Sequence, residues 1–285
     1  MSQQWPIGIF TSVGSGLGLP LPVAVELGIT TIHLHAPQHN ERSAIHARDI
    51  FSMLAESDIA VSCLFAGFEG ESYADISTVE RTVGLVNPDT QAERKNELKL
   101  ISDFGKLLDV PSVGLHVGFV PHDTDSKGYC DVLQIMREVC DHCANHGQDL
   151  HLETGQETAE ALFQFLQDVE RSNLFVNFDP ANMILYGVGE PLPALELLAP
   201  FVRSVHCKDA RWSDQPGVTW GEEVPLGEGD VDIPAYLQTL KRIGYDGPLT
   251  IEREIPQEAE RQRHEIGQAV KLLETLKQDI LSLEG

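Results

Sequence analysis

Four side chains of types that bind divalent metal ions each follow an apolar run of the sequence. They are Glu153, Asp179, His206 and Glu252, in the segments HLETGQET, NFDPANM, SVHCKD and TIERE. A carboxylate at the end of a buried strand either faces the open rim of a barrel or is costly to bury alone. The intervals between the four match one or two strand-plus-helix units, so we expect all four at one rim.

This ligand set indicates which metal the site would take. Two Glu, one Asp and one His form an oxygen-rich site, and the imidazole shifts its preference toward transition metals. The sequence therefore predicts one divalent-metal site, with Mn²⁺ favoured and Mg²⁺, Co²⁺ or Zn²⁺ as alternatives. Such an ion could act as a Lewis acid on a substrate carbonyl.

The elements that must position these ligands alternate along the chain. Eight short apolar runs are predicted as strands, near residues 8, 32, 62, 115, 151, 176, 204 and 250. Helical apolar periodicity occurs between them, for example over 161–169, 233–240 and 266–280. In the last of these we expect the intervening charges to be solvated: Lys271, Glu274, Lys277 and Asp279. Length and alternation predict a (β/α)8 TIM barrel, with residues 1–285 as a single domain.

Composition excludes several classes of partner. Lys and Arg total 20 against 44 Asp and Glu, so the net charge of −24 repels phosphate backbones and anionic lipids. We expect no nucleic acid and no membrane partner. The N-terminus lacks a signal-peptide pattern, and no apolar run approaches the roughly 20 residues of a membrane span, which predicts a cytoplasmic protein.

Two short motifs have simpler explanations than function. The five cysteines do not suggest a disulfide framework, and the pair Cys140 and Cys143 fits a helical apolar face better than a zinc or redox site. The glycines at 14–18 superficially match a dinucleotide turn. Because Pro20 and Pro22 would hinder the helix that such a turn must open, we do not expect dinucleotide binding.

The four ligand segments resemble those of the sugar phosphate isomerase/epimerase family, whose barrel is similar to that of xylose isomerase. FDPANMILYG, VHCKD and PLGEGDVD carry the same resemblance. It implies that Glu153, Asp179, His206 and Glu252 bind one divalent ion. It also implies that Glu153 and Glu252 are catalytic: one removes a proton next to a carbonyl and the other returns it, through an enediolate.

Further residues at the same rim are candidates for substrate binding: His116, Glu157, Asn182, Lys208, Arg211, His35 and Trp212. Glu157 could orient a substrate hydroxyl or favour a helix N-terminus. Trp212 and Trp220 could close over a sugar, His33 is expected in the core, and Lys208 and Arg211 could instead pair with Asp209 or Asp214. Asn182 stands where ketose 3-epimerases carry a His, which leaves the substrate open.

The expected function is a metal-dependent isomerase or epimerase of a sugar or sugar phosphate. The partner is then a small sugar or polyol-derived ketone, with a homo-oligomer (dimer or tetramer) left open. An inosose-type dehydratase and a hydroxypyruvate isomerase use a similar metal site. An endonuclease IV-like enzyme needs three zinc ions, for which Asn182 and the loop after His206 lack ligands. A non-catalytic sugar-binding protein would not need two proton-transfer groups.

Overall fold

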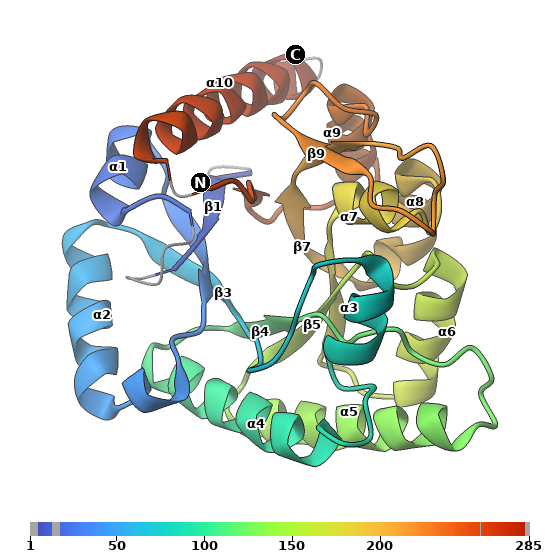
Figure 1. The fold of residues 1–285 in the computed structure, drawn as a ribbon. Coiled ribbons are helices and arrows are strands. Elements are labelled where there is room, and N and C mark those ends of the chain that lie inside the picture. Colours follow the sequence, from blue (N-terminus) through green and yellow to red (C-terminus); the bar gives the residue numbers. More distant parts are fainter. Residues whose placement is uncertain (1–4, 13–17, 257, 283–285) are drawn as a thin grey trace.

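A computed structural model describes residues 5–12, 18–256 and 258–282 of the chain. Residues 14–17 of the glycine-rich turn lie outside the described residues. Eight parallel strands close into a barrel in the order β1-β10-β7-β6-β5-β4-β3-β2 (Figure 1). The predicted TIM barrel is confirmed. Its strands are β1 (Ile7–Thr11), β2 (Thr31–His35), β3 (Ala60–Phe65), β4 (Ser112–Leu115), β5 (Asp149–Glu153), β6 (Leu174–Phe178), β7 (Val202–Cys207) and β10 (Leu249–Ile251).

Helices surround the strands, as Figure 1 shows. They are α1 (Leu21–Glu26), α2 (Ala44–Glu56), α3 (Ile76–Thr82), α4 (Gln91–Leu107), α5 (Lys127–Asn145), α6 (Ala159–Val169), α7 (Pro180–Tyr186), α8 (Pro191–Leu198), α9 (Ile233–Arg242) and α10 (Ala259–Ser282), with 3₁₀ turns η1 (His39–Glu41) and η2 (Ala199–Phe201). A two-stranded antiparallel ribbon, β8 (Asp209–Arg211) and β9 (Glu222–Val224), follows β7.

The core lies inside the barrel and between the strands and the helices. On α5 the buried positions include Val132, Met136, Val139, Cys140 and Cys143, which recur at helical spacing. Cys140 and Cys143 are both buried and free, in agreement with the expected packing role. Burial raises the pKa of the Cys143 thiol to about 11, so this thiol is a poor metal ligand or nucleophile.

One expected surface charge is buried instead. The ammonium group of Lys277 in α10 donates to the backbone oxygen of Trp5, at 3.4 Å, and pairs with Glu274 at 2.7 Å. Only 7% of the Lys277 side chain is exposed. The expectation that Lys277 is solvated was therefore wrong, because α10 packs beside the start of β1 and the lysine stem covers that contact.

One buried carboxylate makes several hydrogen bonds to the loop after β9. Asp209 is buried, and its two oxygens accept the backbone N–H groups of Ala210, Gly227, Gly229 and Val231 at 2.9–3.2 Å. The segment PLGEGDVD thus wraps around Asp209 before α9 begins. Asp209 does not pair with Lys208, contrary to one of the expected alternatives.

Among the helices of the described residues, none combines the length and the apolar character that a membrane span requires.

Candidate metal centre and its surroundings

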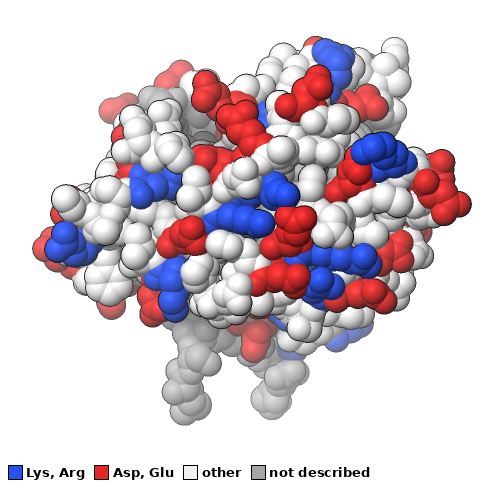
Figure 2. All heavy atoms as spheres, turned by 90° about the horizontal axis from the view of Figure 1, so that it is seen from below, with Lys and Arg blue, Asp and Glu red and all other residues white. Residues whose placement is uncertain are grey.

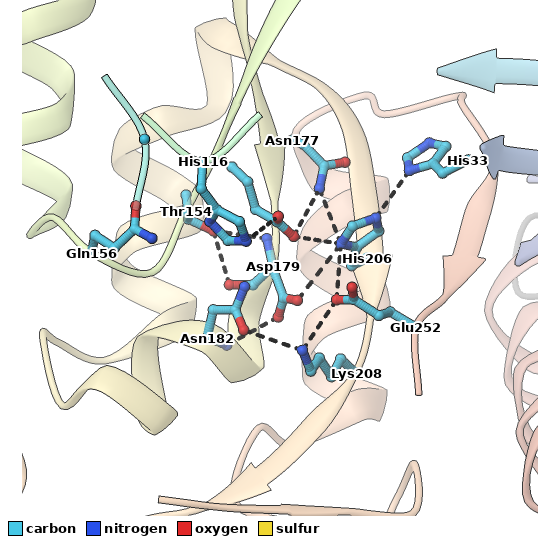
Figure 3. Close-up of polar contacts among 12 residues, drawn as sticks. His33, His116, Thr154, Gln156, Asn177, Asp179, Asn182, His206, Lys208 and Glu252 are labelled. Atoms are coloured by element: carbon cyan, nitrogen blue, oxygen red, sulfur yellow. Dashed lines mark hydrogen bonds and ion pairs between the residues drawn. The ribbon is translucent and has the colours of Figure 1, made fainter. Parts of the chain in front are cut away.

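The four predicted ligands come together at the carboxyl ends of the barrel strands. Figure 3 labels three of them, Asp179, His206 and Glu252. Glu153 ends β5, His206 lies near the end of β7, Asp179 is the N-cap of α7, and Glu252 directly follows β10. One ligand atom from each lies within 4.8 Å of the others, and all four residues are buried. The rim geometry inferred from strand spacing thus agrees with their positions.

The imidazole of His206 is the centre of the cluster. Its Nδ1 lies 2.6 Å from Glu153 Oε1, 3.2 Å from Glu252 Oε2 and 3.7 Å from Asp179 Oδ2. Three carboxylates therefore converge on one nitrogen, which is the arrangement of a site built for a cation.

The two carboxylate oxygens of Asp179 differ in their hydrogen bonding. Its Oδ1 accepts the backbone N–H groups of Ala181 and Asn182, at 2.8 and 3.0 Å, and so caps α7. Its Oδ2 is buried and accepts no hydrogen bond. A buried carboxylate oxygen without a donor is costly, and a bound cation would satisfy it. The cluster fits a divalent metal on this observation as well as on its ligand types.

A threonine fixes the ends of two of these strands against each other. The Thr154 hydroxyl donates to the backbone oxygen of Asp179, at 2.9 Å, and accepts the N–H of the same residue, at 2.8 Å. Gly155 follows with φ +143°, and a Cβ there would lie 2.7 Å from that of Asn182. A glycine at 155 therefore permits α7 to pack closely on this turn.

Two residues that support His206 were not predicted as part of the site. Asn177 in β6 donates through Nδ2 to Glu153 Oε1, at 3.4 Å. His33 in β2 places its Nδ1 3.0 Å from His206 Nε2, so it can accept the Nε2–H of His206 and orient that ring with Nδ1 toward the carboxylates. The expectation that His33 is in the core is right as to burial, but the ring also contacts a candidate ligand.

The two glutamates have different cationic neighbours. Glu153 Oε2 lies 2.8 Å from Nε2 of His116, the residue after β4. Glu252 Oε2 lies 3.2 Å from the ammonium of Lys208, which also donates to Asn182 at 3.3 Å. His116, Asn182 and Lys208 therefore lie next to the cluster, which agrees with the positions expected from the sequence. Lys208 also faces Glu223 and Glu254, at 3.9 and 3.6 Å.

These contacts set the charges of the cluster. Burial lowers the pKa of His206, but the carboxylates of Glu252 and Glu153 outweigh it and raise that pKa well above its ordinary value. Burial raises the pKa of Glu153, yet the nearby imidazoles of His116 and His206 hold it well below the usual range. For His116, burial lowers the pKa, and the opposing carboxylate of Glu153 brings it to about 8. The Glu153 carboxylate is therefore in the ionised form that binds cations.

A cavity of about 230 Å³ opens beside the cluster. Its wall includes two polar groups of the site, His116 and Lys208, and an aromatic pair, Tyr186 and Trp220, whose ring centroids are 4.6 Å apart. The remaining lining residues are Tyr73, Asn182, Leu185, Gly221, Glu223 and Glu254. Trp220, rather than the Trp212 named as a candidate, thus contributes to the wall of this cavity.

Four residues that were candidates for substrate binding do not line this cavity: Arg211, Trp212, Glu157 and His35. The exposed guanidinium of Arg211 donates to the backbone oxygen of Glu228, and Trp212 is partly buried against the core. Glu157 accepts the N–H of Val120 and lines a separate cavity of about 60 Å³. Thr158 is the N-cap of α6, so Glu157 lies one residue before that cap, near the helix N-terminus. His35 lines a third cavity, of about 620 Å³, between the loops after β2 and β3.

The sequence also matches a described family. A model of the xylose isomerase-like TIM barrel family matches residues 21–277. The chain belongs to this family. Its match to the uncharacterised protein MJ1311 from Methanocaldococcus jannaschii is 26% identical over 183 residues, which is 60% of this chain. The match spans 57% of the length of that relative.

Several solved structures share the barrel. A xylose isomerase domain protein from Planctomyces limnophilus is 50% identical, with a TM-score of 0.96 over 98% of this chain and 100% of its own. A D-tagatose 3-epimerase-like protein is 16% identical, with a TM-score of 0.74 over 99% and 100% of the two chains. A xylose isomerase-like TIM barrel protein from Mycobacterium smegmatis in complex with magnesium is 18% identical, with a TM-score of 0.66 over 93% and 96%.

Proposed function

We propose that this protein is a divalent-metal-dependent sugar isomerase or epimerase, with Glu153 and Glu252 as its two proton-transfer groups. One observation carries the proposal. Two buried glutamates from opposite ends of a four-strand arc, β5-β6-β7-β10, approach the same nitrogen of His206. Next to them, His116 and Lys208 border the cavity. We expect a substrate that enters from the cavity to place its reacting carbon next to both carboxylates.

Glu153, Asp179, His206 and Glu252 would hold the metal. When bound, a divalent cation polarises the substrate carbonyl as a Lewis acid and acidifies the neighbouring C–H bond. The mixed nitrogen and oxygen ligands favour Mn²⁺, and Co²⁺ and Zn²⁺ are further candidates. The magnesium complex of the Mycobacterium smegmatis relative supports Mg²⁺ as the first alternative.

The unequal neighbours of the glutamates suit a pair in which one group takes a proton and the other gives one. Such a pair needs different proton affinities in its two members. Glu153 contacts an imidazole, His116, which can itself accept or return a proton. Glu252 contacts the ammonium of Lys208, a permanent positive charge. His116 in its neutral form could take over a proton from Glu153, whereas Lys208 places a fixed positive charge beside Glu252.

The cavity favours an unphosphorylated sugar. Lys208 is the lysine in its wall, and three carboxylates, those of Glu252, Glu223 and Glu254, already surround its ammonium. A phosphate would meet the negative field of Glu223 and Glu254. Hydroxyl groups instead find donors and acceptors in His116, Asn182 and Lys208, and the Tyr186–Trp220 pair offers an apolar surface for the C–H face of a ring.

Deuterium exchange tests the proposal directly. Metal-loaded protein is incubated in D₂O with a panel of unphosphorylated ketoses, inososes and hydroxypyruvate, and the products are analysed by NMR and mass spectrometry. We expect deuterium at the carbon next to the carbonyl of a ketose, together with its epimer or isomer. A product lighter by one water would assign a dehydratase to the same site instead.

Two substitutions test the proton-transfer roles. Glu153→Gln and Glu252→Gln each remove one proton-transfer group, so we expect turnover to fall by at least about 10²-fold while substrate binding partly survives. Glu222→Gln, at an exposed glutamate of β9, is the matched control and should leave turnover unchanged. Unchanged turnover in either site variant would refute the assignment.

A further inference from the structure

Two histidines of α5 lie one turn apart on the side of the helix that meets α4. His142 is in the last turn, and His146 is the residue that ends the helix. The spacing of four places both side chains on one helix face. Both rings reach the same oxygen of α4: His142 Nε2 is 2.7 Å and His146 Nε2 is 2.8 Å from Asp103 Oδ1.

We propose that Asp103, His142 and His146 form a second metal site, which takes a divalent transition-metal ion such as Zn²⁺, Ni²⁺ or Co²⁺. One ligand atom from each residue lies within 4.8 Å of the others. The two imidazole centroids are 5.1 Å apart and the rings are nearly perpendicular, at 86°. This site is independent of the proposed reaction, because its residues lie on the outer helices and not at the barrel rim.

The ligand types select the class of metal. Two neutral imidazole nitrogens and one carboxylate oxygen suit Zn²⁺, Ni²⁺ and Co²⁺, whereas Mg²⁺ and Ca²⁺ prefer oxygen ligands throughout. Three protein ligands leave a coordination position for water, as in open zinc sites. The ion would join α4 to α5 across their contact.

The cluster has the access and the freedom that metal binding requires. The side chains of Asp103, His142 and His146 are 47%, 27% and 25% exposed. Ligand atoms about 2.1 Å from a tetrahedral ion lie about 3.4 Å from one another. The present nitrogen–oxygen contacts must therefore open by roughly 0.6 Å, which the half-exposed Asp103 side chain can supply by rotation.

Two other carboxylates near this cluster already have permanent cations. Glu138 pairs with Lys95 and Lys99, and Asp141 pairs with Arg171. Figure 2 views the molecule from the side on which α4 and α5 lie in Figure 1, and acidic and basic side chains alternate there. Asp103 differs, because its partners are imidazoles, which can exchange a proton for a metal ion.

Metal analysis of variants tests the site. Wild-type protein and the His142→Gln/His146→Gln double variant are dialysed against Zn²⁺ or Ni²⁺, and retained metal is counted by elemental analysis. We expect the double variant to retain one equivalent fewer than wild type, whatever the barrel centre holds. His264→Gln, at an exposed histidine of α10, is the matched control and should retain the wild-type amount.

Cobalt provides a second readout. Bound Co²⁺ should give a visible d–d spectrum with a component that is absent from the double variant and weakened in Asp103→Asn. Because the ion ties α4 to α5, Zn²⁺ should also raise the Tm of wild type more than that of the double variant. Equal metal content together with identical cobalt spectra in wild type and the double variant would overturn the proposal.

Discussion

Glu157 illustrates how burial alone can set the charge of a carboxyl group. Burial raises its pKa to about 8, although the N–H of Val120 opposes this by donating to Oε1. Its other oxygen is buried and accepts no hydrogen bond, and the exposed ring of His122 lies 3.6 Å from it. In the unfolded chain the same group titrates near 4.5. The folded protein therefore retains a proton at neutral pH that the unfolded chain releases.

This difference predicts a pH dependence of stability. A folded-state pKa above the unfolded value means that stability falls as pH rises from about 4.5 through about 8. Glu157→Gln keeps a side-chain oxygen that can accept the N–H of Val120, and it removes the titrating carboxyl group. Between pH 6 and pH 8 the variant should gain about 2 kcal/mol in unfolding free energy relative to wild type. Urea unfolding across this range measures it, and parallel pH profiles of the two proteins would contradict it.

At the residue scale, the position at strand ends predicted that the four candidate ligands lie together at one rim, but it did not identify their neighbours. Each ligand is the polar end of an apolar strand, a signal that is local in sequence. His33 contacts His206 across the closed barrel, where β1 and β10 separate β2 from β7, and its sequence context resembles that of a core position. Alternation along β6 places Asn177 on the same side as Asp179, a signal that could have identified it.

Asp209 acts at the scale of an element, because one side chain organises a loop. Asp209→Ala would leave four backbone N–H groups without their acceptor. We expect a loss of about 3 kcal/mol in unfolding free energy and faster proteolysis within residues 225–232. Asp214→Ala, at an exposed aspartate nearby, is the control and should change neither. Wild-type stability together with wild-type cleavage of the loop in Asp209→Ala would refute this role.

The regular elements were easier to predict than the loops between them. All eight barrel strands follow from their apolar runs, and the apolar stripes of α6, α9 and α10 from helical spacing. The β8–β9 ribbon was missed. Its conformation depends on contacts such as those of Asp209 with residues 227–231, which are distant in sequence. For the same reason the sequence did not indicate which of Trp212 and Trp220 lines the cavity.

At the scale of the whole molecule, the first and last parts of the chain meet. β1 pairs with β10, Trp5 Nε1 donates to the backbone oxygen of Tyr245, at 2.7 Å, and α10 contacts Trp5 through Lys277. Glu252 stands directly after β10. Barrel closure thus brings one candidate ligand to the other three, so metal binding should report on the integrity of the entire fold.

Metal should accordingly stabilise the whole protein. An ion that binds the folded state alone, at 100 times its Kd, contributes about 2.7 kcal/mol. For a chain of this size we expect Mn²⁺ to raise the Tm by about 4–5 °C. Calorimetry of the His142→Gln/His146→Gln variant isolates the barrel centre. Asp179→Asn, which keeps an oxygen for capping α7, should reduce the rise. An unchanged Tm with Mn²⁺, Mg²⁺ and Co²⁺ would argue against the centre.

The Thr154 hydroxyl has a consequence for how this protein can evolve. Both of its hydrogen-bond partners are backbone atoms of Asp179, and Thr154 itself directly follows Glu153. The hydroxyl therefore fixes the two candidate ligands, Glu153 and Asp179, relative to each other. Because no partner side chain takes part, no second substitution can compensate for its loss. Among natural or selected variants, position 154 should admit serine, exclude the isosteric valine, and show no covariation with any other site.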